Sequence, residues 1–322
     1  MAYYYSNLSD KNKKLYDIMF DGINKLERKI ALPHASGDDL FSAFNSVIYD
    51  NPLLFYTRSF RSAAVNLGWP SSIIPVYKYD ADFINSSAHV ISEYLETFEA
   101  VRSDSDLEKE LFVHDHCLDN FTYDMQMNEH AFSALGPVVF NTGVCEGISK
   151  FVKLALNYLG VDCIVVTGRG YSPVNPEKAE PHMWNMVYVN GVTYHLDVTF
   201  DLTQKGSVNR YDYFNLPDNE ILKDHSISRT VPACETAGDD YYSLSEQVFG
   251  SLTEAEKYIE AQLREGNTSI VFKLINTEFD SRIVNDITQV ATLQFQKLRN
   301  TAGFLEVRPN LKQGVFELGF KT

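Results

Sequence analysis

The feature that most constrains the fold of this chain is a two-residue turn, Asn190-Gly191, between two segments with β-strand composition. Asn-Gly is the residue pair that most readily adopts the left-handed backbone of a tight hairpin. The segments 182–189 and 192–198 are rich in β-branched and aromatic residues, which favour strands. Because a two-residue loop fixes how the strands pair, it also decides which side chains share a face. We therefore expect an antiparallel hairpin over residues 182–198.

The register of this hairpin brings a histidine beside an aspartate. Counting outward from the turn, Val189 faces Val192 and Trp184 faces Asp197, and His182 lies on the same face as Asp197. Diagonal neighbours on one face lie about 7–8 Å apart, within reach of an imidazole and a carboxylate. A single His or Asp in a hairpin is commonly a structural hydrogen-bonding group. Together, His182 and Asp197 have the arrangement of a general base and the group that orients it.

Cys145 stands where a loop turns into a helix. The run from Cys145 to Gly160 carries an apolar stripe at helical spacing, and Gly160 suits the position after a helix end. N–H groups of the first turn lack helical partners and the helix dipole favours negative charge, so a thiol there ionises more readily. The same N–H groups can bind an oxyanion. Glu146 acts against the thiolate if it points inward, and an ordinary buried cysteine is the alternative interpretation.

These three residues make a nucleophile, a base and an orienting group. Cys145 would attack as a thiolate, and His182 would take its proton and later return it to the leaving amine. Asp197 would fix the tautomer of His182 and stabilise its imidazolium. The pattern predicts a Cys-His-Asp triad, because the three residue types together are far less common by accident than each one alone.

The segments around these residues resemble the core of the bacterial transglutaminase-like superfamily. The shared motifs are Gly-Val-Cys-x-Gly around Cys145, His-x-Trp-Asn from His182 to Asn185, and an aspartate, Asp197, before Val-Thr-Phe-Asp. The order Cys, His, Asp agrees as well. Segments 111–124 and 211–225 also look like that family, so the resemblance is close over residues 100–230 and looser elsewhere.

The resemblance implies an α+β fold with a papain-like core, in which the helix bearing the Cys packs on an antiparallel sheet. We expect three parts: an N-terminal helical region over 1–100, the transglutaminase-like catalytic core over 101–228, and a small C-terminal α/β domain over 229–322. The last part reads as helices near 253–265 and 283–298 with strands 269–274, 304–308 and 315–320.

Three further residues are candidates for oxyanion binding or support of the site. Animal transglutaminases use a Trp upstream of the Cys for the oxyanion, and no Trp lies shortly before Cys145. Tyr123 is therefore the candidate donor, and a half-buried aromatic at a helix end is its alternative interpretation. Trp184 and Asn185 carry over from the His-x-Trp-Asn motif. His195 matches the family's structural histidine, so we do not expect it to be the base.

No metal and no cofactor is expected. His114 and Cys117 lie three residues apart on a predicted helix, but a second matching pair is missing, and zinc needs three or four convergent ligands. The calcium sites of the animal enzymes have no recognisable counterpart. No phosphate-binding glycine loop or dinucleotide fingerprint occurs either.

The charge and hydropathy of the chain limit the kinds of partner that we expect. With 28 basic and 43 acidic residues the net charge is −15, which argues against nucleic acid. No apolar run approaches the roughly 18 residues of a membrane span. The first residues lack the pattern of a signal peptide, so we expect a cytoplasmic protein, or a secreted or cell-surface one if a signal has been removed. A protein or peptide substrate and an amine acceptor are the expected partners.

Three functions remain open from the sequence. The first is acyl transfer on amides through a Cys145 thioester, of the protein-glutamine transglutaminase or deamidase type. The second is a cysteine protease or peptidase of the same fold, and the third is a non-catalytic protein-binding module. The acceptor of the acyl group depends on the shape of the pocket and the exclusion of water, which the motifs do not determine.

Overall fold

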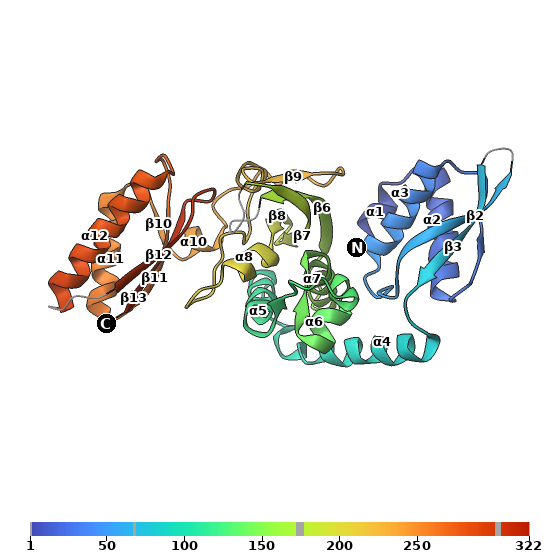
Figure 1. Ribbon diagram of the computed structural model, residues 1–322, viewed down its shortest axis with the longest axis horizontal. Coiled ribbons are helices and arrows are strands. Elements are labelled where there is room, and N and C mark those ends of the chain that lie inside the picture. The colour runs from blue at the N-terminus through green and yellow to red at the C-terminus, as the bar shows by residue number, and fades with distance from the viewer. Residues whose placement is uncertain (1, 67–68, 172–176, 300–303, 322) are drawn as a thin grey trace. The chain divides into compact units, whose positions relative to one another are not determined.

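The structure of the protein is a computed structural model that describes residues 2–66, 69–171, 177–299 and 304–321 (Figure 1). Helices and strands are mixed, and the sheets are largely antiparallel, which confirms the α+β class. The chain forms two compact units, Met1–Val166 with Met183–Gly191, and Thr167–His182 with Val192–Thr322. The three domain boundaries expected from the sequence stay a prediction.

The first hundred residues are helical only in part. Their helices are α1 (Tyr3–Ser6), α2 (Asp10–Asn24), α3 (Gly37–Asp50) and α4 (Ala81–Glu96). A three-stranded antiparallel sheet of order β1-β3-β2 lies among them, from β1 (Ile30–Ala31), β2 (Thr57–Asn66) and β3 (Trp69–Tyr77). The helical expectation missed this sheet because β3 carries Pro70 and Pro75, and proline counts against a strand in any sequence pattern.

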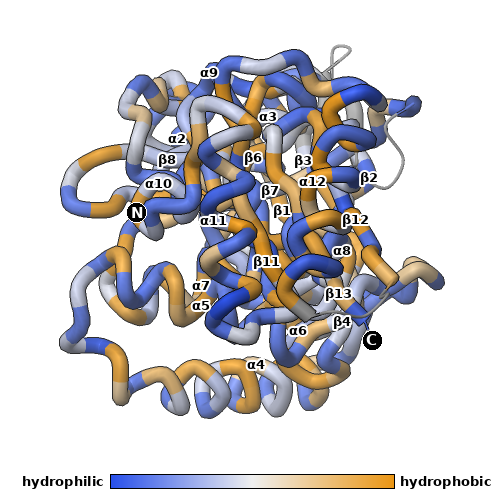
Figure 2. The backbone as a smooth tube through the Cα atoms, turned by 90° about the vertical axis from the view of Figure 1, so that its left-hand side faces the viewer, coloured by the Kyte–Doolittle hydropathy of each residue, from blue (hydrophilic) through white to orange (hydrophobic). Residues whose placement is uncertain are grey.

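Four helices of the first unit, α2, α3, α4 and α5 (Asp106–Asn120), begin at residues whose side chains cap them. Asp80 caps α4, whose tube alternates between apolar and polar residues in Figure 2. Ser105 caps α5 and forms a reciprocal capping box with Glu108. Three short helices lie between α4 and Cys145 in the sequence: η1 (Glu99–Val101), η2 (Glu129–Phe132) and α6 (Leu135–Phe140).

Helix α7 (Cys145–Tyr158) begins at the cysteine, as the sequence predicts. It is followed by β6 (Cys163–Tyr171), β7 (Ala179–Val189) and β8 (Val192–Leu196), and β9 (His225–Ile227) completes a sheet of order β8-β7-β6-β9. Asn190 and Gly191 have φ of +52° and +81°, which confirms the expected turn type. The predicted strand 192–198 ends early, at Leu196, because Asp197 caps α8 (Val198–Gln204).

The C-terminal residues form a four-stranded sheet of order β10-β11-β13-β12 with two long helices. Its strands are β10 (Val248–Phe249), β11 (Ser269–Leu274), β12 (Phe304–Asn310) and β13 (Val315–Lys321). Figure 1 shows α11 (Leu252–Glu265) and α12 (Ser281–Arg299) beside each other against this sheet. The helices and strands expected here are confirmed, because each follows a clear apolar periodicity. The short helices α9 (Asp218–Ile221) and α10 (Tyr241–Leu244) precede them.

In the part of the chain that the structure describes, no helix combines the length and apolar character that crossing a membrane requires.

Candidate active site

The imidazole of His182 is hydrogen-bonded to the carboxylate of Asp197. Nε2 of His182 lies 2.7 Å from Oδ2 of Asp197, and both side chains are almost fully buried. His182 comes from β7, and Asp197 stands between the end of β8 and the start of α8. The hydrogen bond to Nε2 leaves Nδ1 as the ring nitrogen that does not face Asp197. The pair thus has the geometry of a base and its orienting carboxylate.

Asp197 is held in place by the backbone of α8. Its Oδ1 accepts hydrogen bonds from the N–H groups of Thr199 and Phe200, both at 3.1 Å. Burial by itself would raise the pKa of Asp197, but the charge and hydrogen bonds of His182 and His225 outweigh burial and lower it below its ordinary value. The carboxylate is therefore ionised and fixed in orientation, as an orienting group must be.

A second histidine bonds to the same carboxylate oxygen. Nε2 of His225, on β9, lies 3.1 Å from Oδ2 of Asp197, and Nδ1 of His225 lies 2.7 Å from Oδ1 of Asp224. Sequence reasoning included Asp224-His225 in a family-like segment but gave neither residue a role. The hairpin count could not find them, because α8 and an irregular segment separate His225 from Asp197 and leave no register to count.

Cys145 is the first residue of α7 and the most accessible of the four cysteines. All four thiols are free, and Cys117, Cys163 and Cys234 are buried while Cys145 is partly exposed. Burial raises the pKa of the Cys163 and Cys234 thiols to about 12 and that of Cys117 well above its ordinary value. Val144, the residue before Cys145, makes no side-chain capping hydrogen bond to the first turn of α7.

Ser149 and Asn185 tie the helix of Cys145 to strand β7. The hydroxyl of Ser149 lies 2.7 Å from the carbonyl oxygen of Cys145 and 2.9 Å from that of Met183. The side-chain amide of Asn185 donates to the carbonyl oxygen of Ser149 at 3.0 Å. Asn185 and Trp184 are both buried, at 1% and 0% exposure. Asn185 therefore uses its amide to hold α7 on the sheet, which is a supporting position.

Glu146 is neutralised by two cations. Nζ of Lys150 lies 2.7 Å from Oε1, and the guanidinium of Arg58 in β2 reaches both carboxylate oxygens, at 3.3 and 2.7 Å. Burial by itself would raise the pKa of Glu146, but the charges of Lys150 and Arg58 lower it. The sequence raised the possibility that Glu146 opposes a thiolate at Cys145, and these two cations offset its charge.

Tyr123 lies in a short strand beside the loop that leads to Cys145. Strand β4 (Thr122–Tyr123) pairs in parallel with β5 (Thr142–Gly143), and Tyr123 is opposite Gly143. The backbone of Tyr123 is thus next to a residue two positions before Cys145. This neighbourhood suits an oxyanion donor, and the role of its hydroxyl stays a prediction.

Two groups of three residues among the described parts of the chain have the side chains that metals bind, with the ligand atoms of each within 4.8 Å of one another. They are His182, Asp197, His225 and His195, Asp218, Cys234. In the first group, two ring nitrogens lie at hydrogen-bond distance from one carboxylate oxygen. Hydrogen bonds therefore account for the close approach of these three side chains.

His195 belongs to the second group and lies away from the carboxylate of Asp197. Its Nε2 is 2.8 Å from Oδ1 of Asp218, and burial lowers its pKa below the ordinary value. Oδ2 of Asp218 accepts the backbone N–H of Cys234 at 3.0 Å. This group is therefore linked by its own hydrogen bonds, and the interpretation of His195 as a structural histidine agrees with them.

Cys145 belongs to the first unit, and His182 and Asp197 belong to the second. The structure brings His182 and Asp197 together, and the approach of Cys145 to His182 stays a prediction. Asn185 and Trp184 share the first unit with Cys145, as does Tyr123.

Comparison with known proteins finds similarity in the middle of the chain. Residues 96–198 match the model of the Transglutaminase-like superfamily. A crystal structure of a TGase is 16% identical, with 44% of each chain covered and a TM-score of 0.32. A provisionally assigned cysteine protease from Cytophaga hutchinsonii is 15% identical, covering 44% of this chain and 61% of that one, with a TM-score of 0.28.

A provisionally assigned protease from Parabacteroides distasonis is 14% identical, covering 44% of this chain and 30% of that one, with a TM-score of 0.23. This chain spans less than two thirds of each of the three solved structures. No curated protein matches the chain significantly. Cys145, His182 and Asp197 all lie within the segment, residues 96–198, that matches the model of the Transglutaminase-like superfamily.

Proposed function

We propose that this protein catalyses cysteine-dependent acyl transfer on amides, of the protein-glutamine transglutaminase or deamidase type, through a thioester on Cys145. The observation that carries the proposal is the 2.7 Å hydrogen bond between Nε2 of His182 and Oδ2 of Asp197. A buried, ionised carboxylate on one ring nitrogen makes the other nitrogen a stronger base and stabilises the imidazolium that forms. A histidine held in this way can serve as the base for a nucleophile, and Cys145 is the candidate.

The contacts of Ser149 hold the helix that begins at Cys145 against strand β7. Ser149 is one helical turn after Cys145, and its hydroxyl lies 2.9 Å from the carbonyl oxygen of Met183. Met183 follows His182 directly in β7. A hydrogen bond one turn from the thiol to the residue next to the imidazole restricts where the start of α7 can lie on the strand.

The chemistry then follows two balanced half-reactions. The Cys145 sulfur, having given its proton to His182, forms a bond to the amide carbon, and the carbonyl electrons move onto oxygen. As the C–N bond breaks, His182 returns that proton to the nitrogen, which leaves as ammonia or an amine. In the second half, an amine or water attacks the thioester, gives a proton to His182, and the sulfur leaves as the thiolate. The acyl group ends on the amine or as an acid.

The oxyanion of each tetrahedral intermediate needs hydrogen-bond donors. The first-turn N–H groups of α7 have no side-chain cap and point toward the end of the helix that bears Cys145. Tyr123 is next to Gly143 by strand pairing and is the candidate for an additional donor. Removal of one such donor costs about 10²–10³ in kcat in well-studied acyl-transfer enzymes.

A protease of the same fold is the second candidate, because the same three residues attack a peptide bond by the same steps. A non-catalytic binding module is the third, and an unbroken set of Cys145, His182 and Asp197 argues against it. In each case the partner is a protein or a peptide, and in the first a primary amine is the acceptor.

One experiment separates these outcomes. A glutamine-containing peptide is incubated with the protein, with and without a primary amine, and the release of ammonia and the appearance of new peptide termini are measured. Release of ammonia together with incorporation of the amine supports a transferase. Release of ammonia without incorporation of the amine supports a deamidase, and new peptide termini support a protease. Cys145→Ala and His182→Ala should abolish each signal, and His195→Gln serves as the matched histidine control. Turnover that survives Cys145→Ala would overturn the proposal.

A further inference from the structure

His225 is placed between two carboxylates. Its Nε2 lies 3.1 Å from Oδ2 of Asp197 and its Nδ1 lies 2.7 Å from Oδ1 of Asp224, and all three side chains are completely buried. An ionised carboxylate only accepts hydrogen bonds, so each ring nitrogen of His225 must carry a proton to bond to both. A ring with two N–H groups is an imidazolium, so this geometry calls for a charged histidine.

We propose that His225 is a positioning residue of the Cys145, His182 and Asp197 site, an imidazolium clamped between Asp224 and Asp197 that orients Asp197 and offsets part of its charge at His182. This inference rests on the proposed function for its catalytic meaning. The ring of His225 is 5.4 Å from the ring of His182, centroid to centroid, and both bond to the same oxygen of Asp197. Two imidazole rings therefore share one carboxylate oxygen.

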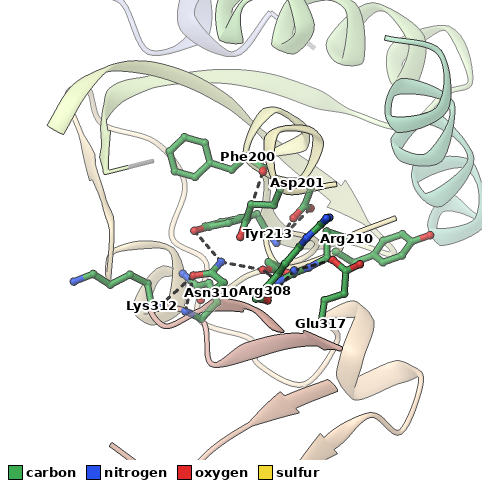
Figure 3. Close-up of polar contacts among 12 residues, drawn as sticks. Phe200, Asp201, Arg210, Tyr213, Arg308, Asn310, Lys312 and Glu317 are labelled. Carbon is green, nitrogen blue, oxygen red and sulfur yellow. Dashed lines mark hydrogen bonds and ion pairs between the residues drawn. The ribbon is translucent and has the colours of Figure 1, made fainter. Parts of the chain in front are cut away.

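The clamp is held from the far side by the C-terminal residues. Oδ2 of Asp224 accepts the hydroxyl of Tyr213 at 2.7 Å and the side-chain amide of Gln313 at 3.4 Å. The amide of Asn310 donates to Tyr213 Oη at 3.2 Å, the link drawn between these two residues in Figure 3. Gln313 and Asn310 lie at the connection between β12 and β13. The C-terminal sheet therefore fixes Asp224, which fixes His225.

The same network continues to buried charges that anchor it. Asn310 also donates to Asp212 at 2.9 Å, and Asp212 forms a two-point ion pair with Arg210 at 3.0 and 2.7 Å. Arg210 also lies 3.5 Å from Glu317 of β13, and Figure 3 shows these groups converging. Buried charges joined in this way hold their geometry tightly, because loosening one leaves others without compensation.

The groups that face His225 decide its charge. Asp197 and Asp224 stabilise the charged ring, while burial and the neighbouring His182 oppose it; His195 is a further buried histidine nearby whose own pKa is lowered by His225. Burial is the largest opposing cause, yet the hydrogen bonds to the two carboxylates outweigh it and raise the pKa of His225 above its ordinary value. His195, with burial dominant, has a lowered pKa.

The test is the protonation state of individual imidazoles in the intact protein. Ring nitrogen chemical shifts of ¹⁵N-histidine-labelled protein are followed from pH 5 to 9.5, and resonances are assigned by their loss in His225→Gln, His182→Gln and His195→Gln. We expect the His225 ring to keep both protons to a higher pH than an ordinary histidine, whose pKa is about 6.5, and the His195 ring to lose its second proton at a lower pH. A singly protonated His225 ring at pH 7 would overturn the proposal.

Replacement of His225 should shift the titration of His182 in a direction that a merely structural role of His225 does not produce. In His225→Gln a positive charge 5.4 Å away is lost, so His182 should keep its second proton to a higher pH, by on the order of one pH unit. If His225 only filled space, loosening Asp197 would move the midpoint of His182 downward or leave it unchanged. His195→Gln is the matched control for a general disturbance of the unit.

A second variant keeps the test valid if His225→Gln folds poorly. Asp224→Asn preserves the shape of the clamp and the ring of His225 but removes one of the two charges, so the His225 titration should move to a lower pH by on the order of one unit. An unchanged His225 titration in this variant would contradict the clamp. These titrations use the resting protein without substrate, so their outcome does not depend on the glutamine-peptide assay. The charge on His225 and the proposed acyl transfer can therefore be contradicted separately.

Discussion

Arg58 of β2 forms a two-point ion pair with Glu146, which is 88 residues further along the chain and directly follows Cys145. The guanidinium also lies over the ring of Phe132, 4.1 Å from its centroid. The N-terminal region thus contacts the first turn of the helix that begins at Cys145. Because Glu146 is an anion beside the thiol, the charge of Arg58 bears on whether Cys145 can ionise.

Replacement of Arg58 should therefore weaken the reactivity of Cys145 more than the fold. In Arg58→Ala, Glu146 keeps only Lys150, so its charge is less fully offset and opposes a thiolate more strongly, and the rate at which iodoacetamide labels Cys145 at a fixed pH should fall. The pair is partly exposed, so the stability loss should be about 1 kcal/mol or less. Lys78→Ala is the matched control, since Lys78 pairs with Glu129 instead. Equal labelling profiles in the two variants would contradict this role.

Alkylation should select Cys145 among the four thiols. Iodoacetamide labelling, read by mass spectrometry, should modify Cys145 faster than the three buried thiols, because Cys145 is partly exposed and a thiolate is the reactive form. Burial holds the pKa of Cys163 and Cys234 at about 12. His182→Ala should remove the selectivity at low pH. Slow and equal labelling of all four cysteines would rule out a thiolate held by its base.

Two substitutions at Asp197 should separate its two roles. Asp197→Asn keeps an oxygen for the N–H groups of Thr199 and Phe200 but loses the charge at His182, so turnover should fall by about 10²–10⁴. Asp197→Ala also removes the cap of α8, so its free energy of unfolding should be about 1 kcal/mol lower than that of the Asn variant. Urea titration and the glutamine-peptide assay measure the two effects. Equal stability of both variants would show that the cap contributes little.

The pH dependence of stability should report the charge on His225. Its pKa in the folded protein is raised, so the stabilisation is fully present below the unfolded value of about 6.5 and is lost as pH rises through the folded value. The free energy of unfolding of His225→Gln should be about 1–2 kcal/mol lower than that of the unchanged protein near pH 5.5. The difference should shrink at alkaline pH. Urea titrations at a series of pH values measure it, and a difference that grows with pH would contradict the assigned charge.

Gly147 should tolerate no side chain, although it lies inside a helix. A Cβ atom there would come within 2.1 Å of the carbonyl oxygen of Ala131 and 2.9 Å of that of Ser133, both backbone atoms. Gly147→Ala should therefore lower the free energy of unfolding by about 1–3 kcal/mol. Gly37→Ala is the matched control, because Gly37 is also helical and has open space around it, and it should be neutral or slightly stabilising. Thermal and urea unfolding measure both.

Local patterns carried much of the prediction. The start of α7 at Cys145, the turn at Asn190-Gly191 and the alternating elements of the C-terminal sheet all follow from apolar spacing and turn residues a few positions apart. The early end of β8 was not predictable in this way, because the side chain of Asp197 competes for the role of helix cap. The prediction for the first hundred residues missed the sheet there, because proline counts against a strand in a sequence pattern and β3 contains two prolines.

The sequence by itself determined the hairpin that sets His182 beside Asp197 and the helix that begins at Cys145, because both depend on residues close together in the chain. Only the tertiary structure decided that His225 shares the carboxylate of Asp197 and that Arg58 offsets Glu146. These partners are separated by 28 and 88 residues. Over such distances no periodicity or turn fixes a register, so packing of the intervening elements alone determines which charges meet.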